Sequence, residues 1–292
     1  MSLPSPRSEQ AYCEVSAIEA GQIELPDDLI LSNATPGAIT TAPSLSFLIQ
    51  HSKNGHKLLF DLGIRHDWQN YPPAVVENIR MCNRVEVTED VVQSLAKGGL
   101  SPSDINIICL SHCHFDHVGD TTPFTQSEFV VGGDTKLLFN PGYPVNPDST
   151  FAADLLPLGR TRYLSAEEEW QAVGPLPRGY DFYGDGSLYI IDAPGHLAGH
   201  LNVLVRTSAD GGWLYLAGDS AHHWNLITGE SDIAVQNHCC EHDDKALAEK
   251  HIERIKALWK MPRVRVLLAH DEPWYKVNKG GSQFWPGKIS SL

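Results

Sequence analysis

Short apolar runs, many of them rich in β-branched residues, recur along the chain between Gly, Pro, Asn and Asp. Runs of this length with such boundaries are typical of β-strands. Strands are therefore predicted at 45–50, 57–61, 105–110, 129–131, 188–193, 201–206, 213–217 and 264–269. Apolar and basic positions alternate over 263–266, which indicates a strand with one face in the core and the other exposed.

Helical patterns lie between these runs. The clearest helix is predicted over 241–260, where apolar positions recur on one face and the two ends carry charges that suit the helix dipole. Shorter helices are predicted over 72–83, with proline in the first turn, and over 88–99, with Thr88 as the cap. Strands and helices in this order predict an α/β layering, with helices packed outside two sheets.

Proline, glycine and aromatic residues are concentrated in 141–186, unlike the rest of the chain. We predict one domain over 1–292 with a loop-rich excursion at about 134–186, holding at most short helices. Its aromatic residues form either a minor core or, as we favour, a wall of a substrate pocket. These are Tyr143, Phe151, Tyr163, Trp170, Tyr180, Phe182 and Tyr183. The segment 32–44 has small residues and is predicted to be a loop over the site or a surface connection.

Composition narrows the class of protein. A chain of 292 residues that is 42% hydrophobic can bury a sizeable core. Its net charge of −14, without any basic run, argues against nucleic acid and anionic membranes as partners. No apolar stretch approaches the ~18 residues of a membrane helix. The N-terminal residues do not resemble a secretory signal, and the six cysteines form no CxxC pair, so a cytoplasmic protein with reduced thiols is expected.

Histidine and aspartate residues follow four of the predicted strands. The motifs are HCHFDH after 105–110, DAPGHLAGH after 188–193, GDSAHH after 213–217 and HDEP after 264–269. Because strand ends in a layered sheet share an edge, these side chains are expected to converge.

The first of these motifs favours two metal ions rather than one. His112 and His114 point the same way in an extended chain, whereas Asp116 and His117 come after a turn and face a second point. Imidazole together with carboxylate favours Zn²⁺, with Fe or Mn as alternatives. Asp219, delivered from another strand, is placed to bridge the pair.

These motifs also carry a family resemblance. HCHFDH at 112–117 matches the HxHxDH signature of the metallo-β-lactamase superfamily, and PGH, GD and a final strand-end histidine follow in that family's order. FDLG at 60–63 is similar to its early strand-ending motif, so the likeness covers nearly the whole chain. The resemblance implies a four-layer αβ/βα sandwich with the site along one edge. It also implies a first metal on His112, His114 and His196, a second on Asp116, His117 and His270, and Asp219 between them.

Within that superfamily the chain resembles the lactonase-like branch, which includes ring-opening lactamases. The likeness lies in GLSPSDINIICLSHCHFDHVGD and LLAHDEPWY. Those lactonases usually carry a tyrosine three residues after the bridging aspartate, where this chain has His222. The departure favours a lactam or a fused cyclic carbamate, such as a benzoxazolinone-type ring, over an acyl-homoserine lactone.

The implied reaction is hydrolysis of a small cyclic ester or amide by attack of metal-bound hydroxide on the carbonyl. His222 is the candidate for supplying the leaving-group proton, with Asp116 as its rival. A thioester or phosphodiester hydrolase and a non-catalytic metal-bound sensor or binding protein stay open as alternatives. A small-molecule substrate is the expected partner, homodimers are common in the lactonase branch, and detoxification of a xenobiotic would fit.

The remaining candidates have structural interpretations. His200 is expected to hydrogen-bond to backbone or to a ligand, and Asp61 to orient a ligand histidine or nearby backbone. His223 and Cys113 are expected to be structural. Cys239 and Cys240, with Glu241 and His242, lack a spaced partner set and are predicted to form only the entry to a helix.

Overall fold

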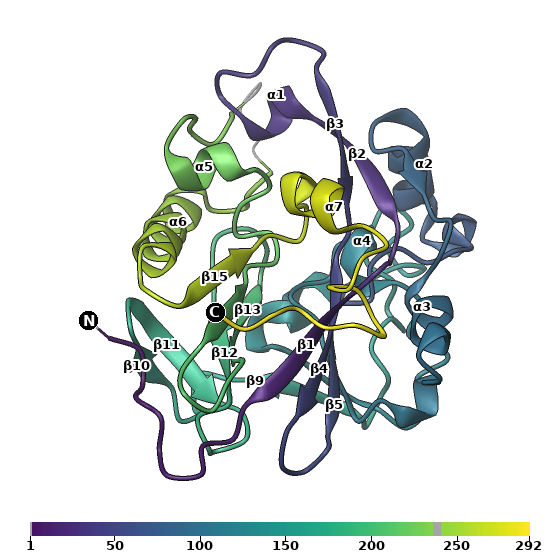
Figure 1. The fold of residues 1–292 in the computed structure, drawn as a ribbon. Helices are drawn as coiled ribbons and strands as arrows, with labels where there is room; N and C mark the ends of the chain where they lie inside the picture. The colour runs from purple at the N-terminus through teal and green to yellow at the C-terminus, as the bar shows by residue number, and fades with distance from the viewer. Residues whose placement is uncertain (1, 236–240) are drawn as a thin grey trace.

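In the computed structural model, which describes residues 2–235 and 241–292, two six-stranded sheets lie against each other (Figure 1). The first has the order β1 (Cys13–Ile18), β4 (Ser46–His51), β5 (Lys57–Phe60), β7 (Ile107–Cys109), β8 (Glu128–Gly132) and β9 (Thr161–Leu164). The second has the order β10 (Gln171–Val173), β11 (Leu176–Asp181), β12 (Leu188–Asp192), β13 (Leu201–Arg206), β14 (Trp213–Leu216) and β15 (Val264–Leu267). A small sheet of β3 (Ile39–Pro43), β2 (Gln22–Pro26) and β6 (Val85–Glu86) lies beside them.

Helices cover the outer faces of the two large sheets (Figure 1). On the side of the first sheet lie α2 (Pro73–Met81), α3 (Val91–Lys97) and α4 (Phe115–Val118). On the side of the second lie α5 (Trp224–Thr228) and α6 (Lys245–Trp259). The remaining helices are α1 (Asp27–Ile30), α7 (Glu272–Asn278) and the 3₁₀ turns η1 (Trp68–Asn70), η2 (Pro102–Asp104) and η3 (Gly133–Phe139). This arrangement confirms the predicted layered α/β fold.

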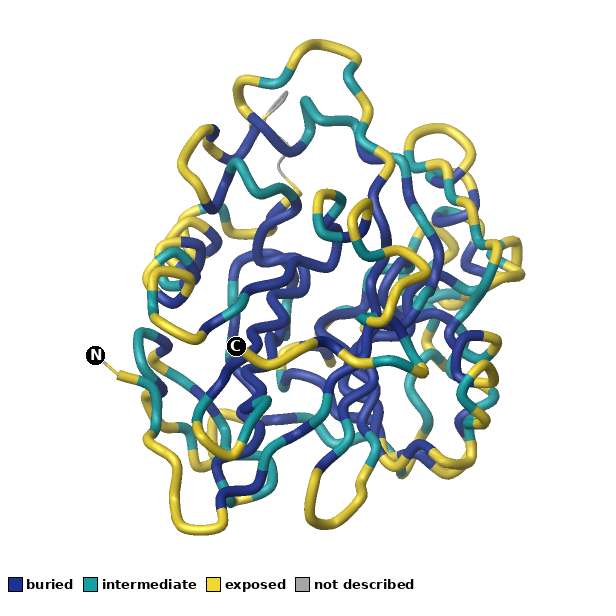
Figure 2. The backbone as a smooth tube through the Cα atoms, viewed as in Figure 1, coloured by how far each residue is buried: buried dark blue, intermediate teal, exposed yellow. Residues whose placement is uncertain are grey.

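The central strands of both sheets, such as β4, β7, β12 and β13, are buried on both faces, which explains why they are almost continuously apolar. In β4, Phe47 and Ile49 pack in the core between the sheets, whereas Leu48 packs in the core beneath the helices. In β12, Ile190 packs between the sheets and Ile191 packs beneath the helices. Because neighbouring side chains of a strand point to opposite faces, one apolar run serves two cores. Figure 2 shows these strands as buried segments at the centre of the molecule.

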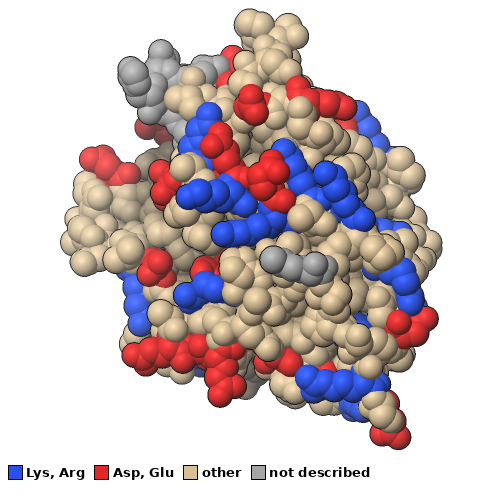
Figure 3. Space-filling model, turned by 90° about the vertical axis from the view of Figure 1, so that its left-hand side faces the viewer, with Lys and Arg blue, Asp and Glu red and all other residues tan. Residues whose placement is uncertain are grey.

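Charged side chains of both signs are interspersed on the face that carries α6 (Figure 3). On α6 itself, Lys256 pairs with Glu253 at 2.7 Å. This face therefore carries mixed charge rather than a single sign. Among the described residues, no helix is both long enough and apolar enough to cross a membrane.

All the strands predicted from apolar runs are present, but the sequence patterns missed others. The excursion at about 134–186 contains β9, β10 and β11 as well as η3, so its prediction as loop with at most short helices was wrong for 161–181. Within 32–44, Ile39–Pro43 pairs with β2 as a strand, so the loop prediction was wrong there too. Both segments pair at sheet edges, where tertiary context outweighs local composition.

Two predicted helices begin later than expected. The helix predicted over 88–99 starts at Val91, because Asp90 rather than Thr88 caps it. The Asp90 carboxylate accepts a hydrogen bond from the Gln93 backbone N–H at 2.9 Å, and the Gln93 side chain accepts from the Asp90 N–H at 3.0 Å. This reciprocal capping box fixes the helix start. Likewise α6 begins after Asp244, whose carboxylate accepts from the Leu247 N–H at 3.0 Å.

Candidate metal centre

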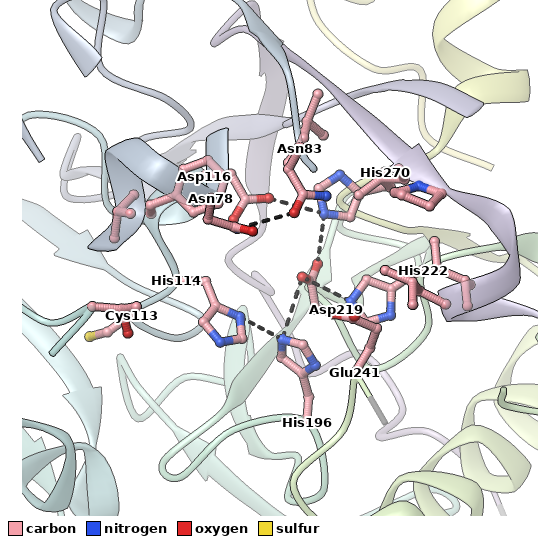
Figure 4. Close-up of a pocket in the computed structure, with 18 of the residues that line it drawn as sticks. Asn78, Asn83, Cys113, His114, Asp116, His196, Asp219, His222, Glu241 and His270 are labelled. Atoms are coloured by element: carbon pink, nitrogen blue, oxygen red, sulfur yellow. Dashed lines mark hydrogen bonds and ion pairs between the residues drawn. The ribbon is translucent and has the colours of Figure 1, made fainter. Parts of the chain in front are cut away.

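The candidate site lies at the edge of the sandwich where the segments after β7, β12, β14 and β15 meet. The structure brings together all seven residues that the sequence singled out as metal ligands. Two four-residue groups result, each able to offer one donor atom per residue within 4.8 Å of the others. The first group is His112, His114, His196 and Asp219, and the second group is Asp116, His117, His270 and Asp219. Figure 4 shows members of both groups around one cavity.

The imidazoles of the first group face one another too closely to satisfy all their hydrogen bonds. His112 Nε2, His114 Nδ1 and His196 Nε2 lie 3.0, 3.0 and 3.2 Å apart. Each nitrogen carries either a proton or a lone pair. At least one of the three contacts therefore brings together two protons or two lone pairs and cannot be a hydrogen bond. Burial lowers the pKa of all three imidazoles, which leaves them neutral. Three neutral nitrogens around one point fit a borderline cation such as Zn²⁺.

The second group differs from the first because it has a carboxylate of its own, that of Asp116. Asp116 Oδ2 lies 3.4 Å from His270 Nε2 and 3.6 Å from His117 Nε2. Although burial opposes protonation, the carboxylates of Asp219 and Asp116 raise the pKa of His117 and His270. Asp116 and His117 lie within the single turn of α4, so the HxHxDH spacing places one pair of donors before that turn and one pair inside it.

Asp219 faces both groups. Its Oδ2 is 3.5 Å from His196 Nε2 and 3.2 Å from His117 Nε2, while Oδ1 is 3.4 Å from His270 Nε2. Burial alone would raise the pKa of Asp219, but the imidazoles of His117 and His270 hold it well below its usual range. The carboxylate is therefore ionised and placed between the two groups.

Hydrogen bonds behind the second group orient its imidazoles. Asp61 Oδ2 accepts from His117 Nδ1 at 2.9 Å, and Oδ1 accepts from the Ser111 backbone N–H at 2.6 Å. His270 Nδ1 donates to the Pro43 carbonyl at 2.8 Å. Each contact fixes a proton on Nδ1, so Nε2 is the nitrogen that faces the group and would bind a cation once its own proton is lost. The role expected for Asp61 is thus present in the structure.

The loop that carries Asp219 is held from behind by buried polar groups. His200 Nε2 accepts from the Asp219 backbone N–H at 3.1 Å, and its Nδ1 donates to the Ala193 carbonyl at 3.1 Å. His200 is therefore bonded to backbone, as expected. The Asn202 carboxamide lies 2.8 Å from the Ser220 hydroxyl and 2.7 Å from the Tyr215 hydroxyl. Sequence reasoning missed this Asn202 network, because no local motif marks it.

The other candidate residues divide between structural and site positions. His222 Nε2 lies 3.3 Å from Asp219 Oδ2, and its ring is stacked 5.9 Å from that of His270. His223 instead caps α5, where its Nδ1 accepts from the Asn225 N–H at 3.0 Å. Cys113 is buried in the core. The expected structural roles of His223 and Cys113 agree with these positions.

The helix-entry prediction for 239–242 agrees with the described half, since Glu241 and His242 lie just before α6, but both residues also reach the site. Cys239 and Cys240 lie outside the described residues. His242 is buried, with its ring centroid 5.2 Å from those of both His196 and His222. Burial lowers the pKa of His242 to about 3. Glu241 lines the cavity (Figure 4). The sequence pattern did not predict that Glu241 and His242 lie at the site, because neither residue follows a strand end.

The cavity beside the two groups has a volume of about 220 Å³ and a mainly apolar wall. Residues of β2, α1 and α2 supply much of that wall, namely Ile23, Leu25, Pro26, Leu29, Ile30 and Val75. Of the aromatic residues in 141–186, Phe151 alone lines this cavity. Trp170, Tyr180, Phe182 and Tyr183 pack against the core between the sheets. The predicted aromatic wall was therefore wrong except at Phe151.

Comparison with known families assigns the chain. Residues 39–270 match the family model described as the metallo-beta-lactamase superfamily. The chain belongs to the metallo-beta-lactamase superfamily. The structure agrees with this membership, since it overlays at a TM-score of 0.71 on a B. thuringiensis AiiA mutant with N-decanoyl-L-homoserine bound at its active site. That likeness, at 20% identity over 99% of this chain and 100% of the other, concerns the fold.

Curated relatives within the superfamily carry several names. The chain is 32% identical over 95% of its length to the Penicillium brevicompactum protein named cytochrome P450 monooxygenase mpaDE', of which it spans 35%. It is 36% identical over 57% of its length to gamma-lactamase MBL2 of Gibberella moniliformis, covering 71% of that protein. The chain thus spans about a third of the first of these relatives.

Proposed function

We propose that this chain is a dinuclear metal-dependent hydrolase that opens a small cyclic ester or amide. The observation that carries the proposal is the position of the Asp219 carboxylate, which lies between a group of three imidazoles and a group of mixed carboxylate and imidazole donors at the wall of an apolar cavity. A sensor or binding protein would need neither two complete donor groups nor a carboxylate shared by both.

Two Zn²⁺ ions suit the donors best, with Fe or Mn as alternatives. His112, His114 and His196 would hold the first ion, Asp116, His117 and His270 the second, and Asp219 would contact both. The contact in the first group that cannot be a hydrogen bond is relieved when a cation accepts all three lone pairs. When bound, such ions activate water near neutral pH and polarise the substrate carbonyl.

The protein's own groups supply binding and proton transfer. The apolar wall from β2 to α2 binds the body of the substrate and excludes water from the ring. His222 and Asp116 both line the cavity, and either side chain can carry a proton to the departing oxygen or nitrogen. We assign this role to His222, because its Nε2 faces the shared Asp219 at 3.3 Å.

A lactam or a fused cyclic carbamate is the substrate class that we favour over a lactone. An amide nitrogen leaves poorly unless it is protonated, and imidazole is the side chain that most often transfers protons in catalysis. The relative named gamma-lactamase MBL2 supports this choice, although it shares only part of the chain. Detoxification of a foreign compound, in the cytoplasm, would be consistent with such chemistry.

The test is a hydrolysis screen of zinc-loaded protein with the metal-free protein as control. A γ-lactam, the matched γ-lactone, a fused aromatic cyclic carbamate and a thioester are compared by kcat/KM. We expect zinc-dependent opening of the lactam or carbamate to exceed that of the lactone. If the thioester is turned over fastest, the protein is a thioester hydrolase rather than a ring-opening one. Absence of any turnover with two ions bound would contradict the proposed function and favour a binding protein.

A further inference from the structure

Three buried histidines form a third group beside the two described above. His196 follows β12, His222 follows β14, and His242 precedes α6, and they are 3, 7 and 3% exposed. Their ring centroids are separated by 4.9, 5.2 and 5.2 Å, and one nitrogen from each ring lies within 4.8 Å of the other two. Apart from His196, no member of this third group (His196, His222 and His242) belongs to the seven residues of the dinuclear centre.

The segment that carries His242 is fixed against the loop that carries His196. The backbone N–H of Asp243 donates to the His196 carbonyl at 3.0 Å, and that of Asp244 donates to the Gly195 carbonyl at 2.9 Å. Asp244 then caps α6. The position of His242 is therefore set by the fold and does not depend on an exposed loop.

Two nitrogens of the third group lack partners. The Nε2 atoms of His196 and His222 face Asp219, whereas Nδ1 of each ring is buried without a hydrogen bond to any described residue. A histidine that binds a metal through one nitrogen normally donates the other N–H to an acceptor. His117 and His270 follow that rule here, through Asp61 and the Pro43 carbonyl. His196 and His222 do not.

We propose that His196, His222 and His242 bind a third divalent cation of the borderline class, such as Zn²⁺. His196 and His222 would contribute Nδ1, and His196 would release its ring proton to solvent and join the third ion to the first. Zn–N bonds of about 2.0–2.1 Å place tetrahedral nitrogens about 3.4 Å apart, so the rings close in by roughly an ångström. Three imidazoles leave the fourth position open for a water molecule or an oxygen ligand.

This site differs in chemistry from the dinuclear centre because it has no carboxylate donor. A borderline cation prefers imidazole, whereas Mg²⁺ and Ca²⁺ require oxygen ligands, so the third group should discriminate against both. Glu241, adjacent to His242, lines the cavity but is exposed. Because Nε2 of His222 remains directed at Asp219, occupation of the third site is compatible with the proposed function.

The test counts ions in tag-free protein that has been stripped with a chelator and titrated with Zn²⁺. Native mass spectrometry and elemental analysis should give three ions per wild-type chain and two per chain of His242→Ala. His223→Ala removes a neighbouring histidine that caps α5 and should retain three. In a parallel Co²⁺ titration, the visible absorption should stop increasing one equivalent earlier in His242→Ala than in the wild type.

The outcomes separate this inference from the proposed function. A wild-type chain that saturates at two ions, or a His242→Ala variant that still binds three, overturns the third site and leaves the dinuclear centre intact. A wild-type chain that binds none overturns both. Should His242→Ala fail to fold by circular dichroism, His242→Gln keeps a polar side chain of similar reach and must show the same loss of one ion.

Discussion

The two groups of the candidate metal centre differ in the charge of their side chains although they share Asp219. The first group offers three imidazoles whose pKa values burial lowers, so they are ready to bind a cation without losing protons. In the second group, carboxylates raise the pKa of His117 and His270, so a cation must displace protons from them. The comparison shows that equal numbers of donors do not make equal sites. Charge and supporting hydrogen bonds distinguish them.

Removal of the shared carboxylate should have the largest effect. Asp219→Asn keeps the shape of the side chain but removes the charge that faces both groups. Residues that only support metal ligands contribute about 10–100-fold to affinity, so loss of a direct shared donor should exceed 100-fold at both positions. Competition titration with a chromophoric chelator measures this. A loss confined to one position would show that Asp219 belongs to one group alone.

Asp61→Asn should affect the second group selectively. Asp61 accepts from His117 Nδ1 at 2.9 Å and does not contact the first group's imidazoles except through Ser111. Affinity at the second group should fall by about 10–100-fold, with little change at the first. Asp67→Asn, an exposed carboxylate change, is the matched control. Equal losses at both groups would contradict the selective role.

These site residues could be predicted from the sequence because each follows a strand, and strand ends meet at one edge whatever the loops do between them. Asp116, His196 and His270 are examples. The cavity wall could not be predicted in this way, since Ile23 and Leu25 lie in a short strand far from any motif. His242 escaped for a related reason: only the packing of α6 against the His196 loop brings it to the site.

The affinity of the two groups for a cation should depend differently on pH. In His112→Ala the first group is impaired, so Co²⁺ binding reports on the second group. Its affinity for Co²⁺ should rise roughly tenfold per pH unit for each proton displaced. The rise should stop above the raised pKa values of His117 and His270. In His270→Ala the second group is impaired, and the affinity of the first group for Co²⁺ should change little near neutral pH, because its imidazoles are already neutral. Titrations at pH 6, 7 and 8 provide the comparison. If Co²⁺ affinity depends on pH with the same slope in both variants, the two groups do not differ in protonation.

Phe151→Ala should give the smallest effect. The ring is part-buried, lines the cavity and stacks 6.4 Å from the ring of His114. Loss of this apolar surface should raise KM roughly fivefold, or about 1 kcal/mol, without changing the number of bound ions. Phe182→Ala, from the same part of the chain, should lower Tm and leave KM unchanged, because Phe182 packs between the sheets. A rise in KM for Phe182→Ala of the same size would mean that the cavity is not the binding site.

The most direct test of a two-group centre is anomalous diffraction at the zinc edge from crystals of the zinc-loaded protein. We expect a peak on each side of the Asp219 carboxylate, one among His112, His114 and His196 and one among Asp116, His117 and His270. A single peak, or peaks away from Asp219, would contradict a two-group centre.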